Sequence, residues 1–184
     1  MIHITKKLQP LFGETLRYID TFWIVFWLIL GHFLSYSVDP NYYLLSPIRA
    51  VIFSIILSDL IAGAYINTTP SVIKYYDHHE RLVKLFPVVH IYPICFVFLF
   101  DVAPLLPMVM YATTTLCSYW ILTMTRFKHV FAWALVMIGA FIFGLVEDSY
   151  SLSFAFGMLM YVMKVVKVFS TRHVMACPVN LSKE

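Results

Sequence analysis

The chain has 184 residues, of which 61% are hydrophobic and 12% are charged, and its mean hydropathy is +0.81. Soluble domains carry about 25% charged residues, so this composition excludes an ordinary water-soluble protein and is typical of an integral membrane protein. The formal net charge is +3, but the basic residues are spread over short loops, which argues against nucleic acid as a partner. We expect one membrane domain over residues 1–184, with the lipid bilayer as its surroundings.

Six apolar stretches follow one another along the chain. A helix of about 20 apolar residues crosses the ~30 Å hydrocarbon layer and satisfies its own backbone polar groups. The stretches that meet this requirement lie at residues 21–38, 43–66, 85–100, 103–124, 130–146 and 151–169. The sequence therefore predicts an all-α polytopic membrane protein with six transmembrane helices.

Lysine and arginine fall almost entirely on one side of this arrangement. Of the 13 basic residues, only Arg49 lies near the other side, where the loops hold Asp39, Asp101, Glu147 and Asp148. Because cytoplasmic loops are rich in Lys and Arg, we expect both termini in the cytoplasm. We expect a bacterial plasma membrane in preference to an organellar one.

The longest connection joins the second and third spans on the basic side. Thr69 followed by Pro70 is a typical helix start, and Val72, Tyr76 and Val83 recur at helical spacing. This pattern predicts an amphipathic helix that lies in the headgroup layer.

Histidines gather on the same side of the membrane. The candidate metal ligands are His78, His79, His90 and His129. Imidazoles bind zinc and iron, and a zinc-bound water beside a carboxylate is a hydrolytic centre. The competing interpretation is a solvated helix face, because Glu80 and Lys84 form an acid-before-base pair and no HExxH spacing occurs. The spacing favours the solvated face.

Two ionisable residues are predicted inside the membrane. Asp59 lies about 10 Å from the inner end of the second span, and Lys164 lies at a similar depth in the sixth. Such residues are costly in lipid and usually face a partner or a cavity. We expect an Asp59 to Lys164 pair, which either holds two helices together, binds a charged substrate or relays protons.

The fourth span places Thr114 and Ser118 on one helix face, where they are candidates to line a ligand pocket. More often such hydroxyls bond to a carbonyl one turn earlier or pack between helices. The small residues around Ser58 and Gly144 predict seams of close helix packing.

Two prolines, Pro87 and Pro93, flank His90 in the third span. Pro93 lacks a backbone NH, so we expect a kink near His90. A broken helix beside an ionisable residue is a recurring way to build a binding site within a membrane. In a short span the same break is also consistent with an irregular helix end at the membrane surface.

The leading hypothesis is a non-catalytic membrane subunit that binds or transports a small molecule. Its pocket is expected toward the cytoplasmic half, among the second, fourth and sixth spans, with Asp59, Lys164, Thr114 and Ser118 as ligand-binding residues. The chain has no ATP-binding loop, so energy for transport would come from an ion gradient or a separate partner.

Two alternatives stay open. One is a metal-dependent enzyme that acts on a lipid or lipophilic substrate at the cytoplasmic face. The other is a structural subunit of a larger membrane complex. The sequence leaves open whether the chain forms a homo-oligomer or joins other membrane subunits, and it identifies no cofactor.

Overall fold

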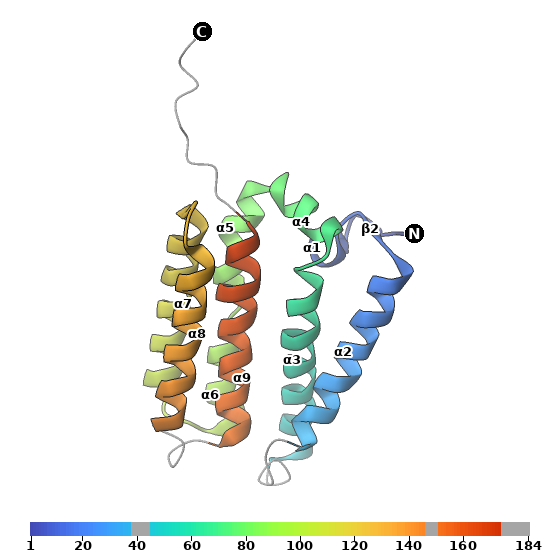
Figure 1. The fold of residues 1–184 in the computed structure, drawn as a ribbon. Coiled ribbons are helices and arrows are strands. Elements are labelled where there is room, and N and C mark those ends of the chain that lie inside the picture. Colours follow the sequence, from blue (N-terminus) through green and yellow to red (C-terminus); the bar gives the residue numbers. More distant parts are fainter. Residues whose placement is uncertain (38–44, 146–150, 174–184) are drawn as a thin grey trace.

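The computed structural model describes residues 1–37, 45–145 and 151–173. It confirms an all-α protein with six helical segments that are long and apolar enough to cross a membrane. These segments are α2 (Tyr18–Ser37), α3 (Pro47–Ile66), α5 (Glu80–Val89) with α6 (Tyr92–Phe100), α7 (Leu105–Thr123), α8 (Lys128–Leu145), and α9 (Leu152–Val162) with η3 (Met163–Ser170). They run side by side through one bundle (Figure 1).

Each segment overlaps one predicted span. The predicted boundaries at residues 38, 43 and 146 lie outside the described residues, as do the loop acids Asp39, Glu147 and Asp148.

The third and sixth spans are irregular helices. The third begins at Glu80, before the predicted start at residue 85, and it is interrupted at His90 and Ile91, as Pro93 predicts. In the sixth span the α-helix gives way to π-helical turns at Met163.

The connection between α3 and α5 contains a short amphipathic helix, α4 (Pro70–Asp77), whose Val72 and Tyr76 are buried. The expected continuation of this helix through Val83 is wrong, because Val83 belongs to α5.

Two histidines cap the C-terminal end of α4. The Nδ1 atoms of His78 and His79 lie 2.7 Å from the carbonyl oxygens of Lys74 and Tyr75 respectively. A carbonyl only accepts, so each Nδ1 donates a hydrogen bond to the last turn of α4. The Tyr75 carbonyl also accepts a hydrogen bond from the His78 backbone amide at 3.2 Å. The chain then turns and starts α5 at Glu80.

The N-terminal segment lies at the same end of the bundle as α4 and the last turn of η3 (Figure 1). It contains α1 (Gln9–Phe12) between two short antiparallel strands, β1 (Ile2–His3) and β2 (Thr15–Leu16). We call this end of the bundle, made by the N-terminal segment, α4 and the last turn of η3, the basic end. Arg49 lies near the opposite end, where its guanidinium forms an ion pair with Asp101.

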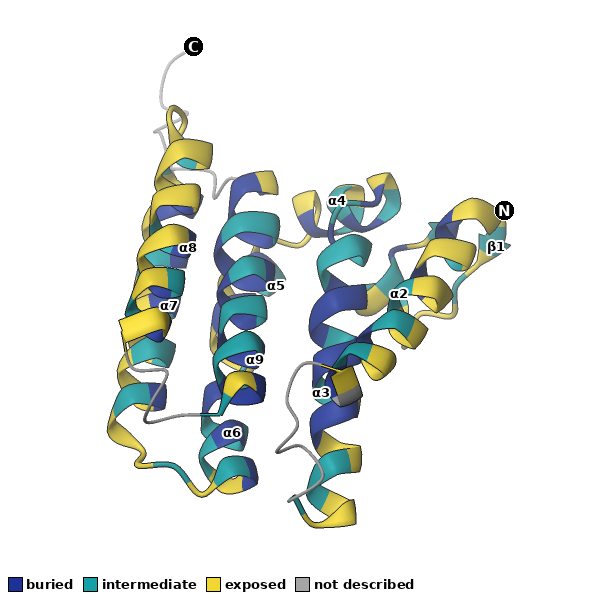
Figure 2. Ribbon diagram, turned by 60° about the horizontal axis from the view of Figure 1, so that its bottom comes forward, coloured by how far each residue is buried: buried dark blue, intermediate teal, exposed yellow. Residues whose placement is uncertain are grey.

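Packing is tightest along α3 and the sixth span, and the outward faces of the helices carry exposed apolar side chains (Figure 2). The rings of Phe53, Phe96 and Phe154 join α3, α6 and α9 in the core. Exposed apolar surface of this kind is suited to lipid, where it costs nothing.

Small residues set the distance between α2 and α3. A Cβ on Gly31 would lie 2.7 Å from the Cα of Ser58, so the predicted seam at Ser58 is confirmed. The seam predicted at Gly144 is wrong, because a Cβ there would meet no described atom within 4 Å.

Candidate functional site

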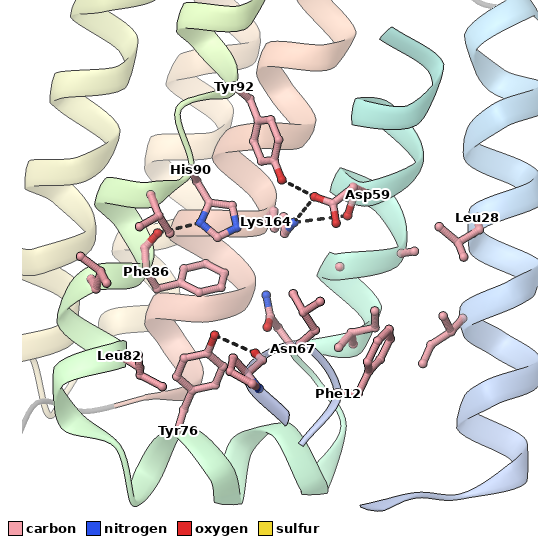
Figure 3. Close-up of a pocket in the computed structure, with 18 residues that line it drawn as sticks. Phe12, Leu28, Asp59, Asn67, Tyr76, Leu82, Phe86, His90, Tyr92 and Lys164 are labelled. Carbon is pink, nitrogen blue, oxygen red and sulfur yellow. Dashed lines mark hydrogen bonds and ion pairs between the residues drawn. The ribbon is translucent and has the colours of Figure 1, made fainter. Parts of the chain in front are cut away.

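A cavity of about 350 Å³ lies between α2, α3, α5, α6 and η3, toward the basic end (Figure 3). Most of its wall is apolar and comes from α1, α2, α3 and α5. The polar side chains that line it are Asp59, Asn67, Tyr76, His90, Tyr92 and Lys164. An apolar cavity of a few hundred Å³ with a few convergent polar groups is the usual form of a small-molecule site.

Asp59 and Lys164 form the ion pair that their similar depth predicts. The Lys164 Nζ atom lies 2.7 Å from Asp59 Oδ2 and 3.3 Å from the Asp59 carbonyl oxygen. The Lys164 side chain is 5% exposed, whereas that of Asp59 is 46% exposed. The lysine is therefore enclosed in protein, and the carboxylate lies at the surface of the cavity.

Gly63 makes room for this lysine. It lies one helical turn after Asp59, and a Cβ at this position would come within 2.6 Å of both Cε and Nζ of Lys164. A larger residue at position 63 would push the ammonium away from Asp59.

Tyr92 adds a second donor to the same carboxylate oxygen. Its hydroxyl donates a hydrogen bond to Asp59 Oδ2, and its ring centroid lies 5.4 Å from Lys164 Nζ, within range of a cation–π interaction. Tyr92 is placed here by the break in the third span, because α6 begins at this residue. Two donors thus converge on Oδ2 of Asp59.

His90 lies in the break itself. Its Nδ1 atom lies 2.6 Å from the Phe86 carbonyl oxygen and must donate to it, which leaves Nε2 of the neutral imidazole as an acceptor. Figure 3 shows the ring on the same side of the cavity as Lys164 and Tyr92. The kinked helix therefore brings an imidazole and a phenol to the ion pair.

The cavity is closed toward the basic end by α1 and α4. The Tyr76 hydroxyl of α4 donates to the carbonyl oxygen of Pro10 at 3.0 Å, which ties α4 to α1. Burial raises the pKa of Tyr76 to about 12, so this hydroxyl stays protonated and remains a donor near neutral pH. Asn67, at the end of α3, places its amide beside this contact (Figure 3).

Thr114 and Ser118 do not line this cavity. Both are buried in α7, and Thr114 faces a separate space of about 70 Å³ between α7, α8 and the sixth span. The pocket predicted among the second, fourth and sixth spans thus differs from this cavity, which involves the first and third spans in place of the fourth.

The four candidate metal ligands are dispersed. His78 and His79 cap α4, His90 lines the cavity, and His129 accepts a hydrogen bond from Lys167 at 3.2 Å. In residues 1–37, 45–145 and 151–173, no three His, Cys, Asp or Glu side chains are grouped to hold a metal ion. The solvated-face interpretation is supported by Glu80 and Lys84, whose charged groups lie 2.6 Å apart.

Tyr92 and Gly63 are the site residues that sequence reasoning missed. Nothing local distinguishes Tyr92 from the other tyrosines of the chain, but its place beside Pro93, just after the expected kink, was a usable signal. Gly63 is one of the small residues near Ser58, a group that predicts only helix packing, yet its position one turn after Asp59 marks space for a partner of that carboxylate.

Comparison of this chain with models of protein families, with curated proteins and with solved structures finds no match.

Proposed function

We propose that the chain is a membrane-embedded subunit that binds or transports a small lipophilic molecule in the cavity between α2, α3, α5 and η3. The observation that carries this proposal is the ion pair of the enclosed Lys164 with Asp59 at the wall of a largely apolar cavity. The apolar wall would hold the body of the ligand, and the ion pair with Tyr92 and His90 would orient its polar end.

The side chains around the cavity support entry from the membrane. Leu28 of α2 is 41% exposed, and Leu85 and Val89 of α5 are 50% and 53% exposed, although all three line the cavity. They belong to two spans that face each other across it (Figure 3). A ligand that is dissolved in lipid would reach Asp59 by passing between these side chains.

The charge pair itself supports a role beyond packing. Enclosing a lysine in a membrane protein is costly, and a well-packed apolar pair would hold α3 and the sixth span together at no greater cost. Charged residues within membranes usually mark a substrate or ion pathway.

We place the protein in a bacterial plasma membrane with the basic end in the cytoplasm, following the positive-inside rule. The cavity then lies in the inner half of the membrane.

Extraction of bound small molecules tests the proposal. The protein is purified in nanodiscs taken directly from the expressing membrane, and the organic extract is compared by mass spectrometry between wild type and Asp59→Asn. The matched control is Asp101→Asn, which removes the carboxylate of the other described interhelical ion pair, at the opposite end of the bundle. We expect a compound enriched with wild type and Asp101→Asn and depleted with Asp59→Asn.

Three other results would count against the proposal. Equal extracts from all three proteins would remove the binding role of Asp59. Stoichiometric zinc or iron in the purified protein would favour the metal-dependent enzyme, and extraction only together with other membrane chains, with an empty cavity, would favour the structural subunit.

A further inference from the structure

Around Asp59, the polar wall of the cavity presents hydrogen-bond acceptors that no described residue uses. Both donors that reach Asp59, the Tyr92 hydroxyl and the Lys164 ammonium, bond to Oδ2, and Lys164 also reaches the Asp59 carbonyl. No described residue donates to Asp59 Oδ1. The Asp59 side chain is 46% exposed and lines the cavity, so its carboxylate is accessible to a molecule there.

His90 contributes a second acceptor. Its Nδ1 hydrogen is used by the Phe86 carbonyl at 2.6 Å, so the neutral ring offers only the lone pair of Nε2 to the cavity. No described residue donates to this atom. The Tyr76 hydroxyl is likewise committed as a donor, to Pro10 at 3.0 Å.

Electrostatics favours the same kind of ligand. The Lys164 side chain is 5% exposed and that of Asp59 is 46% exposed, so the more accessible charged group in the cavity wall is the carboxylate. A carboxylate or phosphate ligand would have to displace Asp59 to reach the ammonium, whereas a cation would add to the carboxylate without breaking the pair.

Resting on the proposed function, we infer that the cavity selects a lipophilic amine: an apolar body with a protonated amino group that donates to Asp59 Oδ1 and His90 Nε2. The apolar wall formed by Leu28, Leu85 and Val89 holds the body. The inference concerns the class of ligand, and it applies equally to a substrate that is transported and to a ligand that stays bound.

Three probes with the same chain and different head groups test this selectivity. Decylamine, 1-decanol and decanoate are added to the protein in nanodiscs of zwitterionic lipid, at matched membrane-bound concentrations, and the thermal unfolding midpoint is measured. Ligands that bind only the folded state raise this midpoint. We expect decylamine near saturation to raise it by about 5 °C, with a smaller shift from decanol and none from decanoate.

Two variants locate the effect. Asp59→Asn should abolish the advantage of decylamine over decanol, and Asp59→Glu should retain it because the carboxylate is kept. Asp101→Asn should behave as wild type. The comparison among probes uses wild-type protein alone, so it stands even where Asp59→Asn folds poorly.

The inference is overturned if decanoate stabilises the protein as much as decylamine does, or if decanol matches decylamine, or if none of the probes shifts the midpoint. None of these results removes the proposed function, which the extraction experiment tests separately.

Discussion

At the scale of single residues, the ion pair of Asp59 and Lys164 is costly to bury, and it offers charged groups that can bind a ligand. The ammonium is enclosed and has Asp59 as its ionic partner, at 2.7 Å. Removing one charge of such a pair leaves the other charge uncompensated. Replacing both charged residues together often has little effect on stability. The two kinds of substitution therefore separate stability from binding.

We predict that Asp59→Asn alone lowers the free energy of unfolding by about 1–3 kcal/mol, less than for a fully buried pair because the carboxylate is half-exposed. The double variant Asp59→Asn with Lys164→Met should recover most of this loss and still fail to retain a ligand. Reversible unfolding in mixed micelles measures the free energy of unfolding of the single and the double variant, and the extraction experiment measures whether a ligand is retained. The prediction is contradicted if the double variant loses as much free energy of unfolding as its two single variants lose together.

His173 is a second enclosed ionisable residue, just after η3. Its side chain is buried against Tyr76 and Phe169, and its Nδ1 atom lies 3.3 Å from Asp77 Oδ1. Burial lowers the pKa of His173 below its ordinary value of 6.5, and the nearby Asp77 carboxylate offsets this only in part. The contact between α4 and the end of the sixth span is therefore made with a neutral imidazole.

This contact should weaken in acid. Above pH 6.5 the imidazole is neutral whether it is buried or released, so stability is complete; as the pH falls from 6.5 toward the lowered pKa, the released state binds the proton first and stability is lost. We predict a lower unfolding midpoint at about pH 5.5 than at about pH 7.5. His173→Gln should reduce this difference, and an unchanged difference would exclude His173 as its source.

At the scale of helices, α2 is held against α3 by a glycine. Gly31→Ala would place a methyl group 2.7 Å from the Ser58 Cα, which neither backbone can avoid without moving. We predict a loss of about 1–3 kcal/mol in the free energy of unfolding. The matched control is Gly139→Ala in α8, where the new methyl would meet nothing within 4 Å and should be tolerated. Equal stability of the two variants would contradict the packing described here.

Much of this helical arrangement follows from the sequence. Apolar length gives the spans, and Pro93 gives the break at His90, because a residue without an NH removes a helical hydrogen bond wherever it lies. The end of α4 at His78 could not be predicted in the same way. It depends on which imidazoles turn back to a carbonyl, and on burial of Tyr76 by residues distant in sequence.

The site was predicted only in part, for a related reason. Asp59 and Lys164 are conspicuous because charge is rare in lipid, so their pairing followed from depth alone. Thr114 and Ser118 are common components of helix packing, and their spacing does not say which neighbour they face. Tyr92 and Leu28 join the cavity through the relative placement of spans, which no local pattern encodes.

At the scale of the whole molecule, the candidate site depends on how the spans are assembled. α2 and α3 pack closely as a pair, and the cavity lies where this pair meets the helices of the third and sixth spans (Figure 1). Residues distant in sequence, such as Asp59 and Lys164, meet at this boundary. A change in the position of α2 and α3 relative to the other helices would open or close the cavity.

The topology gives a prediction at this scale. In a cysteine-free background, Lys7→Cys and Arg126→Cys should react with a membrane-impermeant thiol reagent only from the cytoplasmic side, and Ala103→Cys only from the outside. All three positions are exposed in the structure. Labelling of Arg126→Cys and Ala103→Cys from one side would contradict the six-span arrangement.

The most direct measurement is an experimental density map of the protein purified with its native lipids. We expect density from a bound molecule between Leu28 and Val89, with its polar end at Asp59 Oδ1 and with Lys164 still paired to Oδ2. A map in which α2 packs directly against α5 and fills the cavity, or in which Asp59 turns away from it, would contradict the account.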